Sequence, residues 1–298
     1  REVSPSSLIV VGGHLTASAD VILNKTETDV CVVGDGEQPF LALLKHYEDL
    51  GLKLDIDTLR TVPGLSMLDM EGKTLFSGYP KKSPTEVIPM PDYNFFQNGL
   101  MDSPHLIELY FPPVSSMNRW FSLDQRTEQK HRRQFVAQVP TTKGCTARCT
   151  FCQRSTRGYR LVDLNDLEAH LNVIIEKFDV GFIDVLDENF GGRRDQAYAF
   201  AELMKKYDLL WAASGVRCTN VTKEDIKFYK ESGCCALKFG VESGSQKILD
   251  IMEKNFTVEN VESAISACWE EGIYSPFGLM VGMPGEDNNT IIESGKFL

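Results

Sequence analysis

Three cysteines stand close together in the segment Gly144-Cys-Thr-Ala-Arg-Cys-Thr-Phe-Cys152, near the middle of the chain. Cys145, Cys149 and Cys152 follow the spacing Cys-x3-Cys-x2-Cys. A [4Fe-4S] cubane normally takes one thiolate on each of four irons, so three cysteines can hold only three of its corners. The fourth iron stays open and can chelate the amino and carboxylate groups of a small molecule and pass it an electron. The segment therefore predicts an iron-sulfur cluster with one open iron.

The cysteine segment has two other interpretations. Positions i, i+4 and i+7 also describe one buried face of a helix, and cysteine is a common core residue. The segment contains Gly144, threonines and an arginine, and it lies where a predicted strand meets a loop. Both features argue against that helix. A structural zinc ion needs four ligands, usually from two separated Cys-x2-4-Cys pairs, and the sequence has no second pair of that form. The remaining cysteines are therefore expected to be buried or half-buried thiols; they are Cys31, Cys218, Cys234, Cys235 and Cys268.

The cysteine segment follows the first of five predicted strands in the second half of the chain. These strands lie near residues 135–140, 181–187, 209–216, 236–241 and 273–281, and helical patterns fill the gaps between them. Repeated βα units of about 30 residues favour parallel strands with right-handed crossovers, in an open sheet or a partial barrel. The chain begins just before a strand and ends within a helical pattern, so we expect it to be a piece of a longer polypeptide.

The first part of the chain has its own βαβ pattern. Residues 8–14 and 29–37 are apolar runs that end in glycines, with a helix-length segment between them and a second predicted helix over residues 39–50. From residue 52 the pattern loosens, with a possible hairpin around Glu71-Gly72. We therefore expect an α/β protein with a small α/β domain in residues 1–50, a linker in residues 51–134 and the βα repeats in residues 135–298.

The cysteine segment resembles a known family. Cys-x3-Cys-x-aromatic-Cys is the signature of the radical S-adenosylmethionine (SAM) enzymes, and Thr141 to Cys152 is similar to its form in the subgroup with an N-terminal cobalamin-binding domain. The resemblance implies that residues 135–298 form a partial (β/α)6 radical SAM barrel that lacks its last strand. It also implies that residues 1–50 are part of a doubly wound, Rossmann-like domain of the cobalamin-binding type. The cofactors implied are a [4Fe-4S] cluster on the three cysteines, SAM at the open iron, and cobalamin.

Segments at the carboxyl ends of the strands resemble the family's SAM contacts. The residues implied are Phe151, Asp187, Glu188, Arg217, Glu242, Ser243 and Gly282. The resemblance implies that the acidic pair after the second strand lies near the SAM amino group, and that the Gly-x-Glu-Ser-Gly segment serves the ribose or carboxylate. Arg217 could neutralise the SAM carboxylate, while Phe151 and the glycine-rich fifth strand are placed to meet adenine. Each segment also has a plain structural interpretation, as a helix start, a helix cap or a turn.

The first two strand ends resemble those that line the family's cobalamin pocket. Val11-Gly-Gly-His14 and Val33-Gly-Asp-Gly-Glu37 place Gly12, Gly13, Gly34 and Gly36 where a corrinoid tail would lie against backbone. The sequence departs from relatives that supply an axial histidine from an Asp-x-His-x-x-Gly loop, because none of its five histidines has that setting. Some relatives keep the domain without that histidine, so the resemblance still implies cobalamin.

Composition excludes several classes of partner. The formal net charge of −11 would repel nucleic-acid phosphates and an anionic lipid surface alike. The longest apolar runs fall far short of the roughly 20 residues that a membrane span needs. Eight cysteines and no apparent signal peptide favour a reducing compartment, so we expect a cytoplasmic protein.

The resemblance implies a radical SAM enzyme that cleaves SAM reductively, most often to methylate an unactivated carbon with methylcobalamin. Such an enzyme needs an electron donor such as flavodoxin or ferredoxin, and its substrate, a small molecule or a peptide, is not predicted. One alternative is a cobalamin-independent radical SAM enzyme that catalyses cyclisation, rearrangement or methylthiolation. Methylthiolation is disfavoured because that family carries three cluster cysteines in its N-terminal domain, and this chain offers only Cys31 there. The other alternative, a non-enzymatic iron-sulfur electron carrier, would need four protein ligands.

Overall fold

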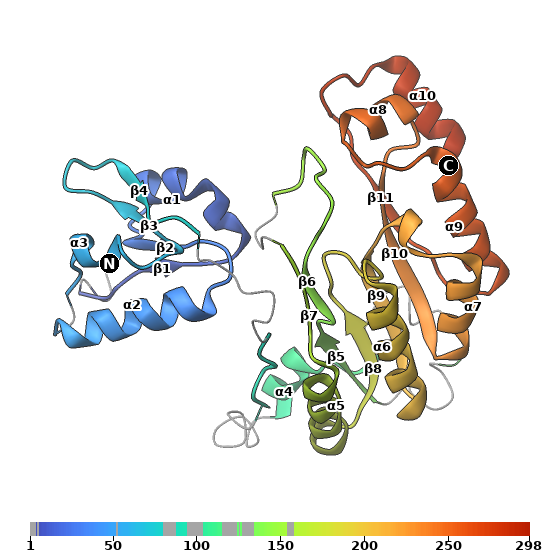
Figure 1. Cartoon of the computed structure of the whole chain (residues 1–298), viewed down its shortest axis with the longest axis horizontal. Helices are drawn as coiled ribbons and strands as arrows, with labels where there is room; N and C mark the ends of the chain where they lie inside the picture. The colour runs from blue at the N-terminus through green and yellow to red at the C-terminus, as the bar shows by residue number, and fades with distance from the viewer. Residues whose placement is uncertain are drawn as a thin grey trace. The chain divides into compact units, whose positions relative to one another are not determined.

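The computed structural model describes most of the chain as two compact units (Figure 1). It describes residues 4, 6–51, 53–79, 88–93, 104–114, 124, 126, 134–153 and 158–298. The first unit lies within residues 1–86 and the second within residues 87–152 and 158–298. In this described part of the chain, no helix is both long and apolar enough to cross a membrane.

The first unit is a four-stranded sheet with helices. Its strands, in the order β1-β2-β3-β4, are Val10–Val11, Val30–Val32, Leu65–Leu68 and Thr74–Phe76. Its α-helices are α1 (Ala19–Lys25), α2 (Glu37–Asp49) and α3 (Ile56–Leu59), and a 3-10 helix spans His14–Ser18. The first two strands are parallel and joined through α1, as the βαβ pattern predicts.

The hairpin near Glu71-Gly72 is confirmed, but it is part of this sheet. Val30 pairs with Met67 in antiparallel fashion, and Met67 in turn pairs with Leu75. Leu65 and Met67 are buried in the same core as the β2 side chains. The first unit therefore includes residues 65–76, which the sequence pattern assigned to the linker, because two short strands carry too few alternating apolar residues to stand out.

The second unit contains the five predicted parallel strands. Their order is β11-β10-β9-β8-β5, with bounds Phe277–Leu279, Cys234–Glu242, Leu210–Val216, Val180–Val185 and Phe135–Val139. The helices between and after them are α5 (Leu164–Phe178), α6 (Arg194–Lys206), α7 (Lys223–Glu231), α8 (Gln246–Ile251), α9 (Val258–Glu270) and α10 (Asn288–Phe297). A short helix, α4 (Pro104–Tyr110), precedes β5, and a 3-10 helix spans Cys218–Asn220. The βα repeats are thus confirmed as a partial barrel.

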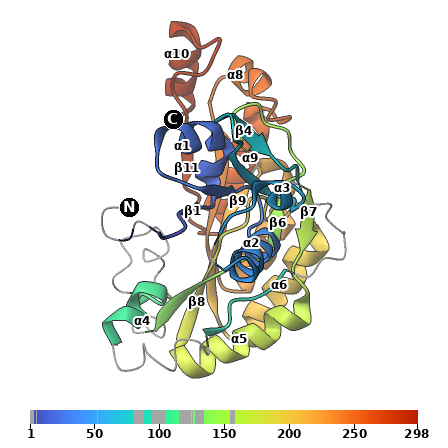
Figure 2. The ribbon, with the colours of Figure 1, turned by 90° about the vertical axis from the view of Figure 1, so that its left-hand side faces the viewer.

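Alternate strand residues face two different cores. Ile183, Trp211 and Leu237 belong to the large core, which also contains the apolar faces of α5, α6, α7 and α9. Phe182 and Ala212 face a smaller cluster on the opposite side of the sheet. The long helices therefore pack on one face of the sheet, as a barrel requires, and Figure 2 shows α5 and α6 side by side.

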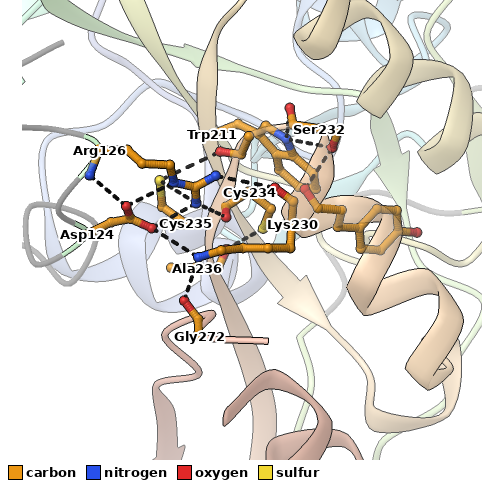
Figure 3. Close-up of polar contacts among 11 residues, drawn as sticks. Asp124, Arg126, Trp211, Lys230, Ser232, Cys234, Cys235, Ala236 and Gly272 are labelled. Atoms are coloured by element: carbon orange, nitrogen blue, oxygen red, sulfur yellow. Dashed lines mark hydrogen bonds and ion pairs between the residues drawn. The ribbon is translucent and has the colours of Figure 1, made fainter. Parts of the chain in front are cut away.

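A half-buried ion-pair cluster joins the linker to the amino end of the second sheet (Figure 3). Arg126 donates a hydrogen bond of 2.6 Å to the carbonyl of Cys234, the first residue of β10, and pairs with Asp124 at 2.8 Å. Lys230 lies 3.5 Å from the Asp124 carboxylate and donates to the carbonyl of Gly272. The cluster lies at the end of β10 away from the strand's carboxyl end, so it is a structural anchor for the linker.

This anchor should give the folding stability a specific pH dependence. Burial alone would raise the pKa of Asp124, but hydrogen bonds from Arg126 and the nearby cations outweigh it and lower the pKa from 3.8 to about 2. The unfolded chain then binds more protons than the folded one, so this stabilisation is full above pH 3.8 and is lost as the pH falls through about 2. Through this group, the unfolding free energy of the wild type should fall by about 2 kcal/mol between pH 5 and pH 2, and Asp124→Asn should abolish that fall. The measurement is a denaturant titration of the protein without an iron-sulfur cluster.

The variant Arg126→Met should also abolish this fall in unfolding free energy, because Arg126 supplies the hydrogen bonds that hold the pKa of Asp124 down. An Asp124→Asn protein that keeps the wild-type acid dependence would contradict this assignment.

Candidate active site at the carboxyl end of the second sheet

The cysteine segment leaves the sheet through a small hairpin that the sequence did not predict. Strand β6 (Thr142–Gly144) begins shortly after β5 ends, and it pairs antiparallel with β7 (Tyr159–Leu161). Gly144 opposes Tyr159, so the paired strands close the base of the loop that carries the cysteines. We call residues 145–152 the cysteine loop. The hairpin places this loop at the carboxyl end of β5.

The three thiols lie near one another but differ in exposure. Cys149 is buried, Cys145 is half-buried and Cys152 is exposed. Burial raises the pKa of the Cys145 thiol, the amide of Ala147 and the charge of Arg217 lower it, and the neighbouring Cys149 and Cys152 raise it again. The loop therefore brings the three predicted ligands within electrostatic range of each other.

The thiols suit a cubane better than a single metal ion. Within the residues that the structure describes, no three His, Cys, Asp or Glu side chains converge so that they could hold one ion. A cubane has no need of such convergence, because each thiolate binds a different iron. The Arg217 guanidinium lies 3.7 Å from the Cys149 sulfur, where a cation stabilises a thiolate. The donor set and its charge thus fit a [4Fe-4S] cluster.

A buried lysine that the sequence analysis missed lies beside the cysteine loop. Lys254 is only 4% exposed, and its Nζ is 3.7 Å from the Glu242 carboxylate. The same ammonium lies 5.6 Å from the ring centre of Phe151 and 5.2 Å from that of Phe256. Arg217 donates a hydrogen bond to the Lys254 carbonyl. Three predicted residues, Phe151, Arg217 and Glu242, are therefore brought together around one unpredicted cation.

Nothing in the local sequence marks Lys254. It follows Glu253 and precedes Asn255 in a polar turn where both neighbours have positive φ. A lysine in such a turn is ordinarily solvated. Only the fold of the β10–α8–α9 segment buries it.

Glu242 and Ser243 end β10 in a constrained turn. Glu242 has φ 72°, and its carbonyl accepts a 2.8 Å hydrogen bond from the amide of Met280, which ties the turn to the neighbouring strand. The buried Ser243 hydroxyl accepts a hydrogen bond from the amide of Ser245 and lies 3.3 Å from the hydroxyl of Ser294. Ser243 therefore contacts its own chain, whereas the Glu242 carboxylate faces Lys254.

Gly282 lies in the loop that follows β11. Its φ of 91° favours glycine, and its amide donates a 2.6 Å hydrogen bond to Glu286. A Cβ built at Gly282 would meet nothing within 4 Å. The backbone there is open on the side where a flat ring could pack.

The two acidic residues after β8 have different settings. Asp187 is buried, and its carboxylate accepts hydrogen bonds from the amides of Thr141 and Thr142 and from the Thr141 hydroxyl. Burial raises the pKa of Asp187, and these hydrogen bonds oppose the rise. Glu188 is exposed. The structure thus directs the Asp187 carboxylate toward the start of the cysteine loop.

The four glycines of the predicted corrinoid site lie in the first unit. The parallel register of Val11 with Cys31 brings the loops after β1 and β2 to one edge of the sheet. Gly13 and Gly34 have φ of 79° and 87°, which side chains rarely adopt, and a Cβ at Gly12 or Gly13 would meet nothing within 4 Å. A Cβ at Gly36 would only touch Val32 at 3.5 Å. This open backbone fits a ligand that lies along the sheet edge.

The fold and the cysteine loop are those of one protein class. The family model of the radical SAM superfamily matches residues 139–298, more than half of the chain, and the chain belongs to this superfamily. Its cofactors are accordingly a [4Fe-4S] cluster and SAM.

Curated relatives extend the similarity over nearly the whole chain. The anaerobic magnesium-protoporphyrin IX monomethyl ester cyclase of Rubrivivax gelatinosus is 26% identical over 99% of this chain and 49% of its own length. The cytidylyl-2-hydroxyethylphosphonate methyltransferase of Streptomyces wedmorensis is 23% identical over 95% of this chain and 53% of its own length. The chain spans about half the length of these relatives.

Solved structures share the fold at lower identity. OxsB, a cobalamin-dependent SAM radical enzyme solved with aqua-cobalamin bound, superposes with a TM-score of 0.72 at 18% identity over 98% of this chain and 39% of its own. TsrM, a radical SAM methyltransferase from Kitasatospora setae with cobalamin and a [4Fe-4S] cluster, gives a TM-score of 0.67 at 16% identity over 97% of this chain and 52% of its own. At such identities the likeness concerns the fold.

Proposed function

We propose that the protein is a cobalamin-dependent radical SAM methyltransferase. The observation that carries the proposal is the pairing of two sites in one chain: the cysteine loop in the second unit, and the glycine-ended parallel strands β1 and β2 in the first. OxsB and TsrM, whose folds resemble the whole chain, hold cobalamin, and one of them is a methyltransferase. When bound, the cluster and SAM supply radical or methyl-donor chemistry and cobalamin supplies a methyl carrier.

The chain's own residues would bind and orient the two cofactors. Cys145, Cys149 and Cys152 hold the cluster, and Arg217 and Lys254 provide two cations for the carboxylate of SAM. Phe151 and the open backbone at Gly282 offer surfaces for adenine. Gly12, Gly13, Gly34 and Gly36 would let the corrinoid tail approach backbone.

A second candidate is a radical SAM cyclase. The relatives at 26% and 27% identity are magnesium-protoporphyrin IX monomethyl ester cyclases, and both match nearly the whole chain. The two candidates use the same cluster, so cluster measurements do not distinguish them. The products formed from SAM do. Either enzyme needs a low-potential electron donor, for which we propose a flavodoxin or ferredoxin.

The test is product analysis after anaerobic cluster reconstitution and reduction. We expect S-adenosylhomocysteine that forms only when hydroxocobalamin is added, because methyl transfer from SAM leaves that product. A protein that releases only 5′-deoxyadenosine, with or without the corrinoid, would favour the cyclase or another cobalamin-independent reaction. A reconstituted protein that binds no SAM by calorimetry would instead be an electron carrier.

A glycine variant tests whether the corrinoid binds to the first unit. Gly12→Leu should fold, because its Cβ meets nothing and its φ is not positive, but the side chain would occupy the corrinoid face. We expect hydroxocobalamin to bind at least about 10-fold more weakly, which corresponds to about 1.4 kcal/mol. The matched control is Gly295→Leu on α10, where a Cβ also meets nothing. Equal corrinoid binding by both variants would contradict the assignment of the glycines.

A further inference from the structure

The end of β8 makes a dense set of contacts with the cysteine loop and its hairpin. Both oxygens of the Asp187 carboxylate are used: Oδ1 accepts from the amides of Thr141 at 2.8 Å and Thr142 at 3.0 Å, and Oδ2 accepts from the Thr141 hydroxyl at 2.5 Å. Thr141 and Thr142 are themselves buried. The three donors belong to the two residues that lead into β6, so the carboxylate fixes the start of the hairpin.

Close packing holds the Asp187 turn in place. A Cβ at Gly215 on β9 would lie 2.2 Å from the Asp187 carbonyl, closer than side chains come to backbone, and Gly215 has φ 71°. A Cβ at Gly192 would lie 2.5 Å from Asn189 and 2.9 Å from the Tyr159 hydroxyl. Gly215 thus packs against the Asp187 backbone, and Gly192 packs against the side chains of Asn189 and Tyr159, so the turn that carries the carboxylate has little room to shift.

Asn189 extends the contact to the cysteine loop itself. Its side-chain amide lies 3.4 Å from the hydroxyl of Thr146, which stands directly after Cys145. Its side-chain oxygen accepts a 2.9 Å hydrogen bond from Asn220, and its carbonyl accepts one from the Tyr159 hydroxyl of β7. Asn189 is 1% exposed, so this network is shielded from water.

The other side of the loop is held by backbone. The amide of Thr150 donates to the carbonyl of Met252, and its hydroxyl donates to the carbonyl of Ile251. The cysteine loop and the strand that leads into it are thus tied at residues 141–142, 146 and 150, which lie before, between and after the first two cysteines.

We infer that Asp187, with Thr141 as its partner, is a positioning residue that sets the geometry of the cluster ligands rather than a direct ligand of SAM. The inference rests on the proposed function, because it assumes that the cysteine loop holds a [4Fe-4S] cluster. Groups that orient metal ligands from the next shell commonly change metal affinity about 10- to 100-fold when removed. The Asp187 carboxylate acts on the same principle one step farther out, because its hydrogen bonds go to Thr141 and Thr142, which lie four and three residues before Cys145.

The test uses Thr141→Val, which removes one donor to Asp187 and keeps the side-chain shape, with Thr141→Ser as the conservative variant. Each protein is reconstituted anaerobically, and the rate of iron loss to a chelator is measured together with the electron paramagnetic resonance spectrum of the reduced cluster. We expect Thr141→Val to lose iron about 10-fold faster with an altered spectrum, and Thr141→Ser to match the wild type. Asp187→Asn should also lose iron about 10-fold faster with an altered spectrum. The Asp187→Asn protein that still holds a cluster should bind SAM with wild-type affinity.

The outcomes separate the two roles. If Asp187→Asn binds SAM at least 10-fold more weakly while its cluster is as stable as in the wild type, the carboxylate acts on SAM and the inference is overturned. The inference is also overturned if Thr141→Val keeps the iron retention and the spectrum of the wild type. Circular dichroism identifies a variant that fails to fold, and the Thr141 pair then decides the question without Asp187→Asn. A wild-type chain that takes up no cluster would overturn the proposed function itself, which is a different result from unchanged variants of a loaded protein.

Discussion

Replacement of Cys149 by alanine should leave the anaerobically reconstituted protein almost free of iron, whereas the wild-type chain should hold about four irons. Cys149 is the buried member of the three thiols, and it is the one beside the Arg217 guanidinium. With three protein ligands there is no spare thiolate, so the loss of one leaves two corners of the cubane without protein ligands. Iron analysis and visible absorbance measure the effect, and Cys145→Ala and Cys152→Ala should give the same result.

Cys268→Ala is the matched control for this experiment. Burial raises the pKa of the Cys268 thiol to about 12, so it stays protonated and is a poor iron ligand. It lies in the core on α9 and should change neither iron content nor absorbance. A Cys149→Ala protein that keeps a full cluster would show that another residue supplies the third corner.

The sequence predicts the parts of this protein that depend on long, regular patterns. Runs such as Val180–Val185 and Leu210–Val216 are almost wholly apolar because both faces of their sheet are covered, and this pattern identifies parallel strands without any structure. The spacing of Cys145, Cys149 and Cys152 is equally local, since all three ligands lie in one loop. These features were enough to predict the fold class and the candidate cluster ligands.

Short elements were missed because their stability comes from distant partners. Strand β6 is only Thr142–Gly144, and it forms because β7 pairs with it and Asp187 binds its first amide. The hairpin formed by β3 and β4 was expected, but its place in the first sheet depends on the pairing of β3 with β2. Three or four residues of this composition have no periodicity that separates a strand from a loop.

The roles of the acidic residues also depended on tertiary contacts. The sequence placed Asp187 near the SAM amino group, as the family resemblance implied. The structure shows its carboxylate against Thr141 and Thr142, while the next residue, Glu188, is the exposed one. A strand end alternates its side chains between two sides, so one residue of an acidic pair faces the chain and the other faces solvent. The order of the two acidic residues in the sequence does not show which of them is buried.

Replacement of Lys254 by methionine should weaken SAM binding to the reconstituted protein by about 10- to 100-fold, the range for a lost hydrogen bond to a charged group. Lys254 is a buried cation beside Phe151, which stands between two cluster cysteines, and it lies on the segment to which Arg217 donates a hydrogen bond. A carboxylate bound at the cluster would therefore meet a positive charge that water does not screen. Methionine keeps the length and apolar stem of the side chain, so calorimetry of SAM binding reports mainly the loss of charge.

Two further variants show whether the charge or the fold is responsible. Lys247→Met removes a lysine whose ion pair with Asp287 is largely exposed, and it should leave SAM affinity unchanged. Lys254→Met leaves the Glu242 carboxylate without the cation 3.7 Å away, which itself could disturb the site. The double variant Lys254→Met/Glu242→Gln removes that unpaired charge. If the double variant regains wild-type SAM affinity, Lys254 serves only to neutralise Glu242. If its affinity stays low while the cluster and the fold are intact, and Glu242→Gln alone binds SAM as the wild type does, the ammonium binds SAM directly.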